Sequence, residues 1–437
     1  MVFGKSRFKF VFIGAGSSSF TLRLVGDILG ESFIEDADIA LVDINTELLD
    51  EVKTAVSNLV SFAGKHFLVE GYADFRTALP DADFVFFTYA TGGYATWKKD
   101  IEICTRHGVH QSVGDTIGPG GIVRTLRTIP VALEIAHEME KICPEAWIIN
   151  YTNPEGAVCL AIQTYTKIKS FGLCHGTPDT ARNLATQVFK VDPSRLAYRA
   201  GGVNHLTWFT NLMIDGEDVY PQLFQLLSDS GYADKEPISY DLFRIFGLYP
   251  APGDRHVEEF FPNFLKQRVM EERNLFWKNN DFVIIDGWRE KARVHLEDIM
   301  KNSKGYEDFL KGSGETSTHF MHSLATGEVS TEMVNIINCG NIENVSDGII
   351  VEVPTFVDRF GLHPQKIGRL PEAIAAKCDA LGREYLLAVG AAMSGDKTKA
   401  LQAFMLDPLS ANCDYPEKLL DELLVENTYL LPEYWNK

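Results

Sequence analysis

Short apolar runs alternate with helix-like segments through the first 175 residues, and this alternation constrains the fold more than any other feature. The run at residues 8–14 (FKFVFIG) reads as a buried strand ending in glycine, and a helical period of apolar residues begins at Phe20. Buried strands separated by helices predict a parallel, doubly wound α/β sheet of the Rossmann type. Further strand-like runs occupy residues 37–44, 83–90, 146–150 and 169–174.

The junction of the first strand and helix has the character of a dinucleotide site. Gly14 and Gly16 let the backbone approach a pyrophosphate at the positive end of the helix, although Ser19 stands where the usual third glycine would be. Asp43, at the end of the second strand, is placed to accept hydrogen bonds from ribose hydroxyls, and its charge favours NAD over NADP. The alternative is a ligand-free tight turn with an Asp that caps the next helix. The predicted NAD contacts are Gly14, Gly16, Ser17, Phe20, Asp43 and Thr88.

After about residue 195 the pattern changes. Longer helical stretches at residues 219–229, 255–279 and 371–393 surround two strand-like runs at residues 332–338 and 348–357. We therefore predict two domains without a flexible linker: an NAD-binding domain over residues 1–195 and a mixed α/β substrate domain over residues 196–437.

Charge and cysteine content narrow the class of protein. The formal net charge is −19, which argues against a nucleic-acid partner because polyanion binding needs a basic surface. No apolar run is long enough to span a membrane, and no signal peptide is evident. Seven scattered cysteines suit reduced thiols. We expect a cytoplasmic enzyme with a small-molecule substrate.

Three polar clusters end or follow strand-like runs, where ligands bind in open α/β sheets. They are residues 150–154 (NYTNP), residues 174–176 (CHG) and the pair Asn204-His205. A thiolate and an imidazole suit a divalent transition metal such as Mn, Fe, Co or Ni when open positions remain for substrate. Taken singly, Cys174 reads as a buried apolar residue and His205 as a structural histidine.

Several long motifs occur in one order: GAGSSSF, LVDI, GDTIGPGGIVRTLRTIPV, NYTNPEGAV, GLCHG, GGVNHLTW and VEVP. In these motifs the chain resembles glycoside hydrolase family 4 over nearly its whole length, a family that depends on NAD rather than on a carboxylate pair. The resemblance implies a fold like that of lactate and malate dehydrogenases, bound NAD and Mn²⁺, and a homo-oligomer.

The resemblance also implies roles for single residues. Cys174 and His205 match the family's metal ligands, and Asn153 matches its contact to a sugar hydroxyl. Asp115 falls where the family carries an acid that supports the catalytic base. Asp254 aligns best with the base itself, and Tyr249 is the alternative.

The implied reaction is a glycoside hydrolysis through transient oxidation. NAD takes a hydride from C3 of the sugar, and the metal polarises the resulting ketone. A side-chain base then removes the C2 proton. Elimination expels the aglycone, water adds and the hydride returns, so that NAD is regenerated in each cycle.

The residue after the metal cysteine indicates the substrate. Branches of the family that act on 6-phospho sugars carry Asp or Asn there, whereas His175 resembles the branch acting on unphosphorylated glycosides. Gly176 resembles α-glucuronidases and α-galacturonidases. We expect an α-linked hexuronide, with α-galacturonide favoured over α-glucuronide and α-galactoside. His175 is the candidate leaving-group acid, and a ligand-orienting role is the alternative.

A uronate needs a cationic partner, and arginine can bind a carboxylate through two hydrogen bonds. Arg293 is the predicted contact, with Arg255 and Arg106 as alternatives. Two other functions are compatible with the predicted NAD-binding domain. A metal-free NAD-dependent 2-hydroxy-acid dehydrogenase would share the nucleotide domain but would give Cys174 and His205 no role. A catalytically silent NAD-binding regulator would show no hydrolysis.

Overall fold

One sheet of 13 strands runs through the computed structural model, which describes residues 5, 7–266, 269, 282–301 and 305–436. Its first six strands are parallel and lie in the order β3-β2-β1-β4-β5-β6. This order confirms the predicted doubly wound sheet. The strands are β1 (Arg7–Ile13), β2 (Asp36–Val42), β3 (Leu68–Tyr72), β4 (Phe84–Phe87), β5 (Trp147–Asn150) and β6 (Lys169–Gly172).

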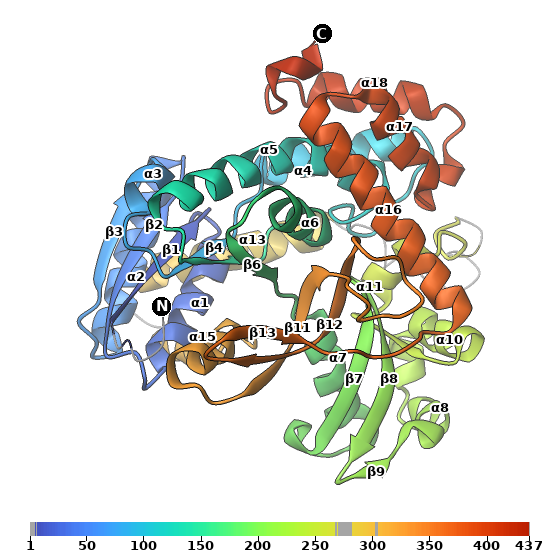
Figure 1. The fold of residues 1–437 in the computed structure, drawn as a ribbon, viewed down its shortest axis with the longest axis horizontal. Helices are drawn as coiled ribbons and strands as arrows, with labels where there is room; N and C mark the ends of the chain where they lie inside the picture. Colours follow the sequence, from blue (N-terminus) through green and yellow to red (C-terminus); the bar gives the residue numbers. More distant parts are fainter. Residues whose placement is uncertain (1–4, 6, 267–268, 270–281, 302–304, 437) are drawn as a thin grey trace.

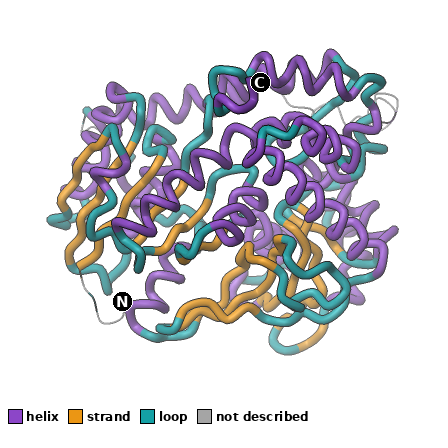
Figure 2. The backbone as a smooth tube through the Cα atoms, turned by 45° about the horizontal axis from the view of Figure 1, so that its top comes forward, coloured by secondary structure: helices purple, strands orange, loops and turns teal. Residues whose placement is uncertain are grey.

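Helices connect these parallel strands and cover the sheet (Figures 1 and 2). The long helix α5 packs against α6 and α4, so that a helical layer lies over the centre of the sheet. The helices of this half are α1 (Ser18–Gly30), α2 (Thr46–Phe62), α3 (Phe75–Ala78), α4 (Gly93–Arg106), α5 (Gly118–Ile142), α6 (Glu155–Tyr165) and α7 (Gly176–Asn183).

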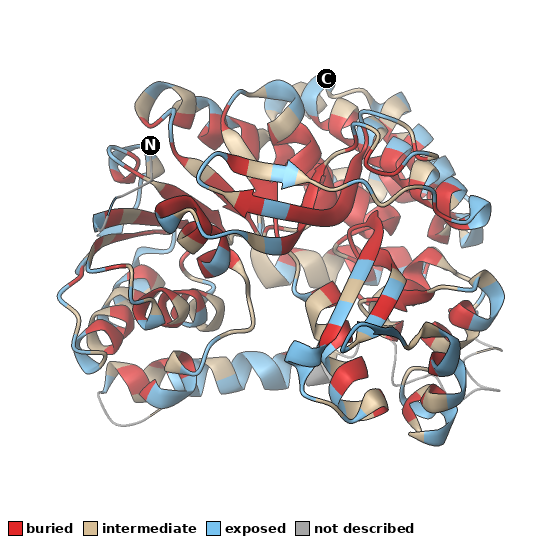
Figure 3. Ribbon diagram, turned by 60° about the horizontal axis from the view of Figure 1, so that its bottom comes forward, coloured by how far each residue is buried: buried red, intermediate tan, exposed pale blue. Residues whose placement is uncertain are grey.

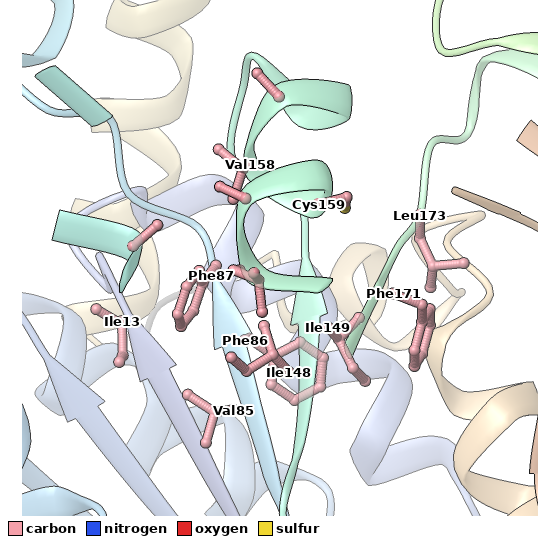
Figure 4. Close-up of a cluster of buried hydrophobic side chains, with 14 of the residues drawn as sticks. Ile13, Val85, Phe86, Phe87, Ile148, Ile149, Val158, Cys159, Phe171 and Leu173 are labelled. Atoms are coloured by element: carbon pink, nitrogen blue, oxygen red, sulfur yellow. The ribbon is translucent and has the colours of Figure 1, made fainter. Parts of the chain in front are cut away.

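The core lies where the central strands meet these helices. Figure 4 shows Phe86 of β4, Ile148 of β5 and Phe171 of β6 near Val158 and Cys159 of α6, and all five are buried. The central strands are buried along almost their whole length (Figure 3). Burial on both faces explains why these strands are continuously apolar in the sequence. The strands end where the buried apolar residues end, and the polar loops begin there.

The second half of the chain extends the same sheet with antiparallel strands. From β6 the sheet continues through β11, β12, β7, β8 and β10 (Figure 1). The added strands are β7 (Leu196–Val203), β8 (Leu206–Ile214), β9 (Glu217–Asp218), β10 (Tyr249–Ala251), β11 (Ser330–Ile337), β12 (Ile350–Asp358) and β13 (Gly361–Pro364).

The predicted elements of this half agree with the structure where it is described. Residues 219–229 form α8, residues 371–393 form α16, and the two strand-like runs form the antiparallel pair β11 and β12. The predicted helix at 255–279 corresponds only to the short α11 at its start; residues 267–268 and 270–279 lie outside the described residues. The helices are α8 (Tyr220–Asp229), α9 (Tyr232–Lys235), α10 (Pro237–Phe246), α11 (Asp254–Val257), α13 (Phe282–Met300), α14 (Tyr306–Leu310), α15 (Ser317–Thr326), α16 (Glu372–Ser394), α17 (Lys397–Leu406) and α18 (Pro416–Glu426).

The β7–β8 hairpin is not among the predicted elements, because Gly201 and Gly202 interrupt its apolar pattern. Close packing requires both glycines. A Cβ atom on Gly201 would lie 2.0 Å from Ile367 Cδ1, and one on Gly202 would lie 2.3 Å from the carbonyl oxygen of Leu206. The hairpin matters because its turn carries Asn204 and His205 toward the parallel half of the sheet.

The two halves of the chain are joined by more than the sheet. Helix α16 packs against α5 and α6 of the first half. The predicted domain boundary at residue 195 coincides with the start of β7 and stays a prediction. Within the described residues, no helix combines the length and hydrophobicity needed to cross a membrane.

Candidate active site

A cavity of about 300 Å³ lies at the carboxyl ends of the parallel strands. Loops after β1, β4, β5 and β6 contribute to it, and so does the β7–β8 turn. Seven residues predicted from the sequence line this one cavity: Ser17, Phe20, Thr88, Asn153, Cys174, His175 and His205.

The turn after β1 has the features of a nucleotide-binding turn. Gly14 has a positive φ of 92°, and a Cβ atom there would lie 2.4 Å from Tyr89 Cα. The backbone N–H of Gly16 donates to Asp43 Oδ2 over 2.7 Å, which ties the turn to the end of β2. No side chain caps the start of α1 at Ser17. The first-turn N–H groups of this helix are therefore available to an anion.

His205 sits in the β7–β8 turn with φ of 64°, a backbone conformation in which only a few non-glycine residues are found. Its Nδ1 atom lies 2.8 Å from Thr116 Oγ1, and the Thr116 hydroxyl donates to Asp115 Oδ1 over 2.9 Å. Because the hydroxyl has one proton, His205 Nδ1 must be the donor to Thr116. The Nε2 atom of His205 then carries the lone pair, which is the form that binds a metal.

Burial lowers the pKa of His205 to about 4, although the nearby Asp115 carboxylate opposes this shift. The imidazole is therefore neutral at pH 7, as metal binding requires. The ring of His256 packs against it, with the two ring centroids 4.2 Å apart.

Cys174 follows β6 and faces the same cavity. The backbone N–H of Gly176 donates to its Sγ atom over 3.4 Å. Burial, reinforced by the Glu352 carboxyl group, raises the pKa of the Cys174 thiol well above its usual value. A cation bound here has to displace the thiol proton. No group of three or more His, Cys, Asp or Glu side chains with metal-site geometry occurs in the described part of the chain, so the donor set fits a metal held by two protein ligands with substrate completing its shell.

Asp115 lies behind the cavity and organises its wall. Its Oδ2 atom accepts a hydrogen bond from Asn153 Nδ2 over 2.8 Å, and its Oδ1 atom accepts from Thr116. Burial opposes ionisation of Asp115, but the Arg124 guanidinium makes the largest contribution that outweighs it, and the pKa of this carboxyl lies below its ordinary value. Asp115 is thus an anion that positions one predicted metal ligand and one predicted sugar contact.

His175 is paired with a residue distant in the sequence. Its Nδ1 atom lies 2.9 Å from Oε1 of Glu315, which follows α14 and also lines the cavity. The hydrogen bond to Glu315 raises the pKa of His175. Glu315 was not singled out in the sequence because it lies 140 positions from its partner.

The two candidates for the catalytic base lie outside the lining of the cavity. Asp254 accepts hydrogen bonds from the backbone N–H groups of Ile238 and Ser239 over 2.8 and 2.7 Å, so it caps the start of α10. These contacts give Asp254 a structural role, and its assignment as the base stays a prediction. The alternative, Tyr249, is buried in β10, and neither residue lines the cavity.

The predicted carboxylate contact also lies elsewhere. Arg293 on α13 pairs with Glu51 on α2 at the exposed surface. Arg106 pairs with Glu422, and the guanidinium of Arg255 lies 5.5 Å from the centre of the Trp288 ring. The arginine that does line the cavity is Arg124 of α5, inside the GDTIGPGGIVRTLRTIPV motif.

Comparisons with known proteins identify the family of this chain. The family described as "Family 4 glycosyl hydrolase" matches residues 9–189, and its C-terminal domain matches residues 200–410. An alpha-galactosidase from Bacillus subtilis is 32% identical and aligns over 98% of this chain and 99% of its own length. An alpha-galacturonidase from Thermoanaerobacter italicus is also 32% identical, over 95% of both chains.

Solved structures give the same result. A 6-phospho-alpha-glucosidase from gut microorganisms, in complex with NAD and glucose-6-phosphate, is 25% identical and covers 98% of this chain and 99% of its own, with a TM-score of 0.83. Malate dehydrogenase from Cryptosporidium parvum shares the fold at 15% identity, with a TM-score of 0.51 over 89% of this chain and 99% of its own. The dehydrogenase-like fold expected from the sequence is therefore confirmed. The chain belongs to family 4 of the glycosyl hydrolases and is an O-glycosyl hydrolase.

Proposed function

We propose that this enzyme hydrolyses α-linked hexuronides, with α-galacturonides favoured, and that it uses NAD and a divalent metal such as Mn²⁺. The observation that carries the proposal is that Cys174 and His205 line one cavity together with Ser17 and Thr88, two of the predicted NAD contacts. A plain dehydrogenase gives that pair of donors no role. When bound, NAD supplies reversible oxidation at C3 of the sugar, and the metal supplies Lewis-acid activation of the adjacent C2–H bond.

The protein's own groups hold the sugar between these two sites. Asn153 is fixed by Asp115, so its remaining polar atoms are oriented for a sugar hydroxyl. His205 presents the lone pair of its Nε2 atom, because Nδ1 keeps its proton and donates it in a hydrogen bond to Thr116. We assign the leaving-group acid to His175, whose ring is oriented by Glu315 at the edge of the same cavity.

The substrate class is supported by two observations. An alpha-galacturonidase and an alpha-galactosidase are equally similar to this chain, so the sugar has the galacto configuration in both comparisons. His175 stands where branches acting on 6-phospho sugars carry Asp or Asn. Action on α-glucuronides or α-galactosides by the same route is the alternative, and a metal-free 2-hydroxy-acid dehydrogenase is the rival reaction. A cytoplasmic location and a homo-oligomeric assembly complete the proposal and rest on the family resemblance and on seven free cysteines.

The test is a substrate panel with NAD, Mn²⁺ and a reductant present. We expect p-nitrophenyl α-galacturonide to be cleaved faster than the α-glucuronide and the α-galactoside. Cys174→Ala should abolish turnover while NAD affinity, measured by calorimetry, stays within about threefold. Cys339→Ala is the matched control, because Cys339 is exposed and lies away from the cavity. Turnover that survives a chelator, or oxidation of a 2-hydroxy acid without hydrolysis, would overturn the proposal.

A further inference from the structure

Arg124 is a half-buried cation in the wall of the cavity, and some of its hydrogen-bond donors are unused. Its Nε atom donates to the carbonyl oxygen of Asn153 over 3.1 Å. Neither Nη atom has a hydrogen-bond or ion-pair partner among the described residues, although Asp115 and Asp100 are near enough to favour its charge. The cavity wall therefore presents guanidinium N–H donors that no described protein group satisfies.

Arg127, one turn later on the same helix, is buried, and its guanidinium has hydrogen-bond and ion-pair partners within the protein. Its Nε atom donates to the carbonyl oxygen of Thr91, and its Nη1 atom contacts both Asn427 Oδ1 and Asp100 Oδ2 over 3.0 and 2.7 Å. Arg127 faces away from the cavity and ties α5 to the C-terminal helices. The contrast indicates that the free Nη donors of Arg124 are available to a ligand in the cavity.

A second group in the wall is also without a partner. The side-chain amide of Asn204 is fully buried, and neither its oxygen nor its nitrogen makes a hydrogen bond in the described structure. Asn204 lines the same cavity as Arg124. Two unpartnered polar groups on one wall therefore point to a ligand with several polar atoms, as a sugar has.

The free end of Arg124 favours an anionic ligand. A guanidinium stays protonated in proteins and presents parallel N–H donors that match the two oxygens of a carboxylate. An uncharged hexoside offers no such pair of charged oxygens.

We propose that Arg124 binds the carboxylate of the sugar and sets the preference for hexuronides over the corresponding uncharged hexosides. Its planar guanidinium can make two parallel hydrogen bonds to a carboxylate, which neither Arg293 nor Arg106 can do from the surface. The inference rests on the glycosidase function proposed above and names the residue that determines its substrate class.

The experiment compares Arg124→Met and Arg124→Lys with the wild-type enzyme. We expect Arg124→Met to lower kcat/KM for p-nitrophenyl α-galacturonide by about 10- to 100-fold, the effect of one charge-assisted contact. The loss of the Nε bond to Asn153 affects both substrates, so the readout is the ratio of kcat/KM for the α-galacturonide to kcat/KM for the α-galactoside, which should fall by about tenfold or more. Arg124→Lys keeps the positive charge but not the paired guanidinium donors, so its kcat/KM for the α-galacturonide should lie between those of the wild type and Arg124→Met. Arg293→Met, on the exposed face of α13, is the matched control and should resemble the wild type.

Calorimetry of D-galacturonate and D-galactose binding provides a readout independent of turnover. A loss of galacturonate affinity in Arg124→Met that is about tenfold or more larger than the loss of galactose affinity supports the proposal. Equal losses for both sugars would give Arg124 a structural role and overturn it, as would a loss of discrimination in Arg293→Met. If the wild type cleaves no glycoside, the proposed function fails, and the binding measurement still decides the role of Arg124. Thermal unfolding of each variant identifies a folding defect.

Discussion

The Nδ1 atom of His205 lies 2.8 Å from the hydroxyl of Thr116, and that hydroxyl in turn donates to Asp115. This chain of two hydrogen bonds fixes the tautomer of His205 and increases the basicity of its Nε2 atom. Carboxylates commonly support metal-binding histidines, and the intervening hydroxyl of Thr116 gives the proposed ligand His205 the same kind of support.

Thr116→Val removes that support while keeping the shape of the side chain. We expect Mn²⁺ affinity to fall by about 10- to 100-fold, because the imidazole loses its fixed orientation. Metal titration followed by calorimetry measures the change. Thr116→Ser restores the hydroxyl and should retain most of the affinity. If Thr116→Val binds the metal as the wild type does, the hydrogen bonds to Thr116 are not part of the metal site.

Gly16→Ala tests the nucleotide turn. A Cβ atom at position 16 would lie 2.6 Å from Asp43 Oδ2 and 2.9 Å from Leu48 Cδ2, so the turn has to shift away from β2. We expect NAD affinity to fall by about tenfold or more. Gly30→Ala at the other end of α1 is the control, because an added Cβ there meets nothing within 4 Å. Unchanged NAD binding in Gly16→Ala would separate this turn from the cofactor.

Asp254→Asn separates helix capping from catalysis. The carboxylate of Asp254 accepts two backbone N–H groups at the start of α10, and an amide can accept only through its one oxygen. We therefore expect the free energy of unfolding to fall by about 1–2 kcal/mol, as measured by urea denaturation. Exchange of the C2 proton of substrate with deuterated solvent should continue. A stable variant in which exchange stops would restore Asp254 as the catalytic base.

Glu259 should make stability depend on pH. Burial raises its pKa to about 8, although the backbone N–H groups of Val113 and Gly114 donate to it and oppose the shift. Between pH 4.5 and 8 the folded protein keeps this carboxyl protonated while the unfolded chain releases the proton. The stabilising contribution is therefore full below about pH 4.5 and is lost as the pH rises toward 8, by at most about 1.4 kcal/mol per pH unit.

Glu259→Gln removes this titration, so its free energy of unfolding should vary less between pH 6 and pH 8 than that of the wild type. Urea denaturation at the two pH values measures the difference. Glu343→Gln changes an exposed carboxyl and should leave the dependence as it is in the wild type. An identical pH dependence in Glu259→Gln and the wild type would show that Glu259 is ionised in the folded protein.

The parallel half of the fold could be predicted because burial on both faces leaves each strand continuously apolar. The placement of Cys174 and His175 at the carboxyl edge of the sheet could also be predicted, because both residues come directly after a buried strand. Contacts between distant segments could not be predicted in this way. Glu315 meets His175 only because the chain after α14 returns to the cavity.

The structural contacts of Asp254 could not be predicted for a related reason. The family resemblance proposes a role for Asp254 but does not show its partners, which are the N–H groups of Ile238 and Ser239 at the start of α10, 16 and 15 positions earlier. Arg124 shows the opposite case. It lies in a motif that sequence inspection does find, but helical periodicity does not reveal which of two nearby arginines remains unpaired.

The path of the sheet sets an order for assembly. Strand β6, which leads to Cys174, is connected to the β7–β8 hairpin and His205 only through β11 and β12. Those two strands are encoded more than 120 residues after His205. We therefore expect Cys174 and His205 to emerge early from the ribosome but to acquire their relative positions late, so that the proposed metal site forms only in the nearly finished polypeptide.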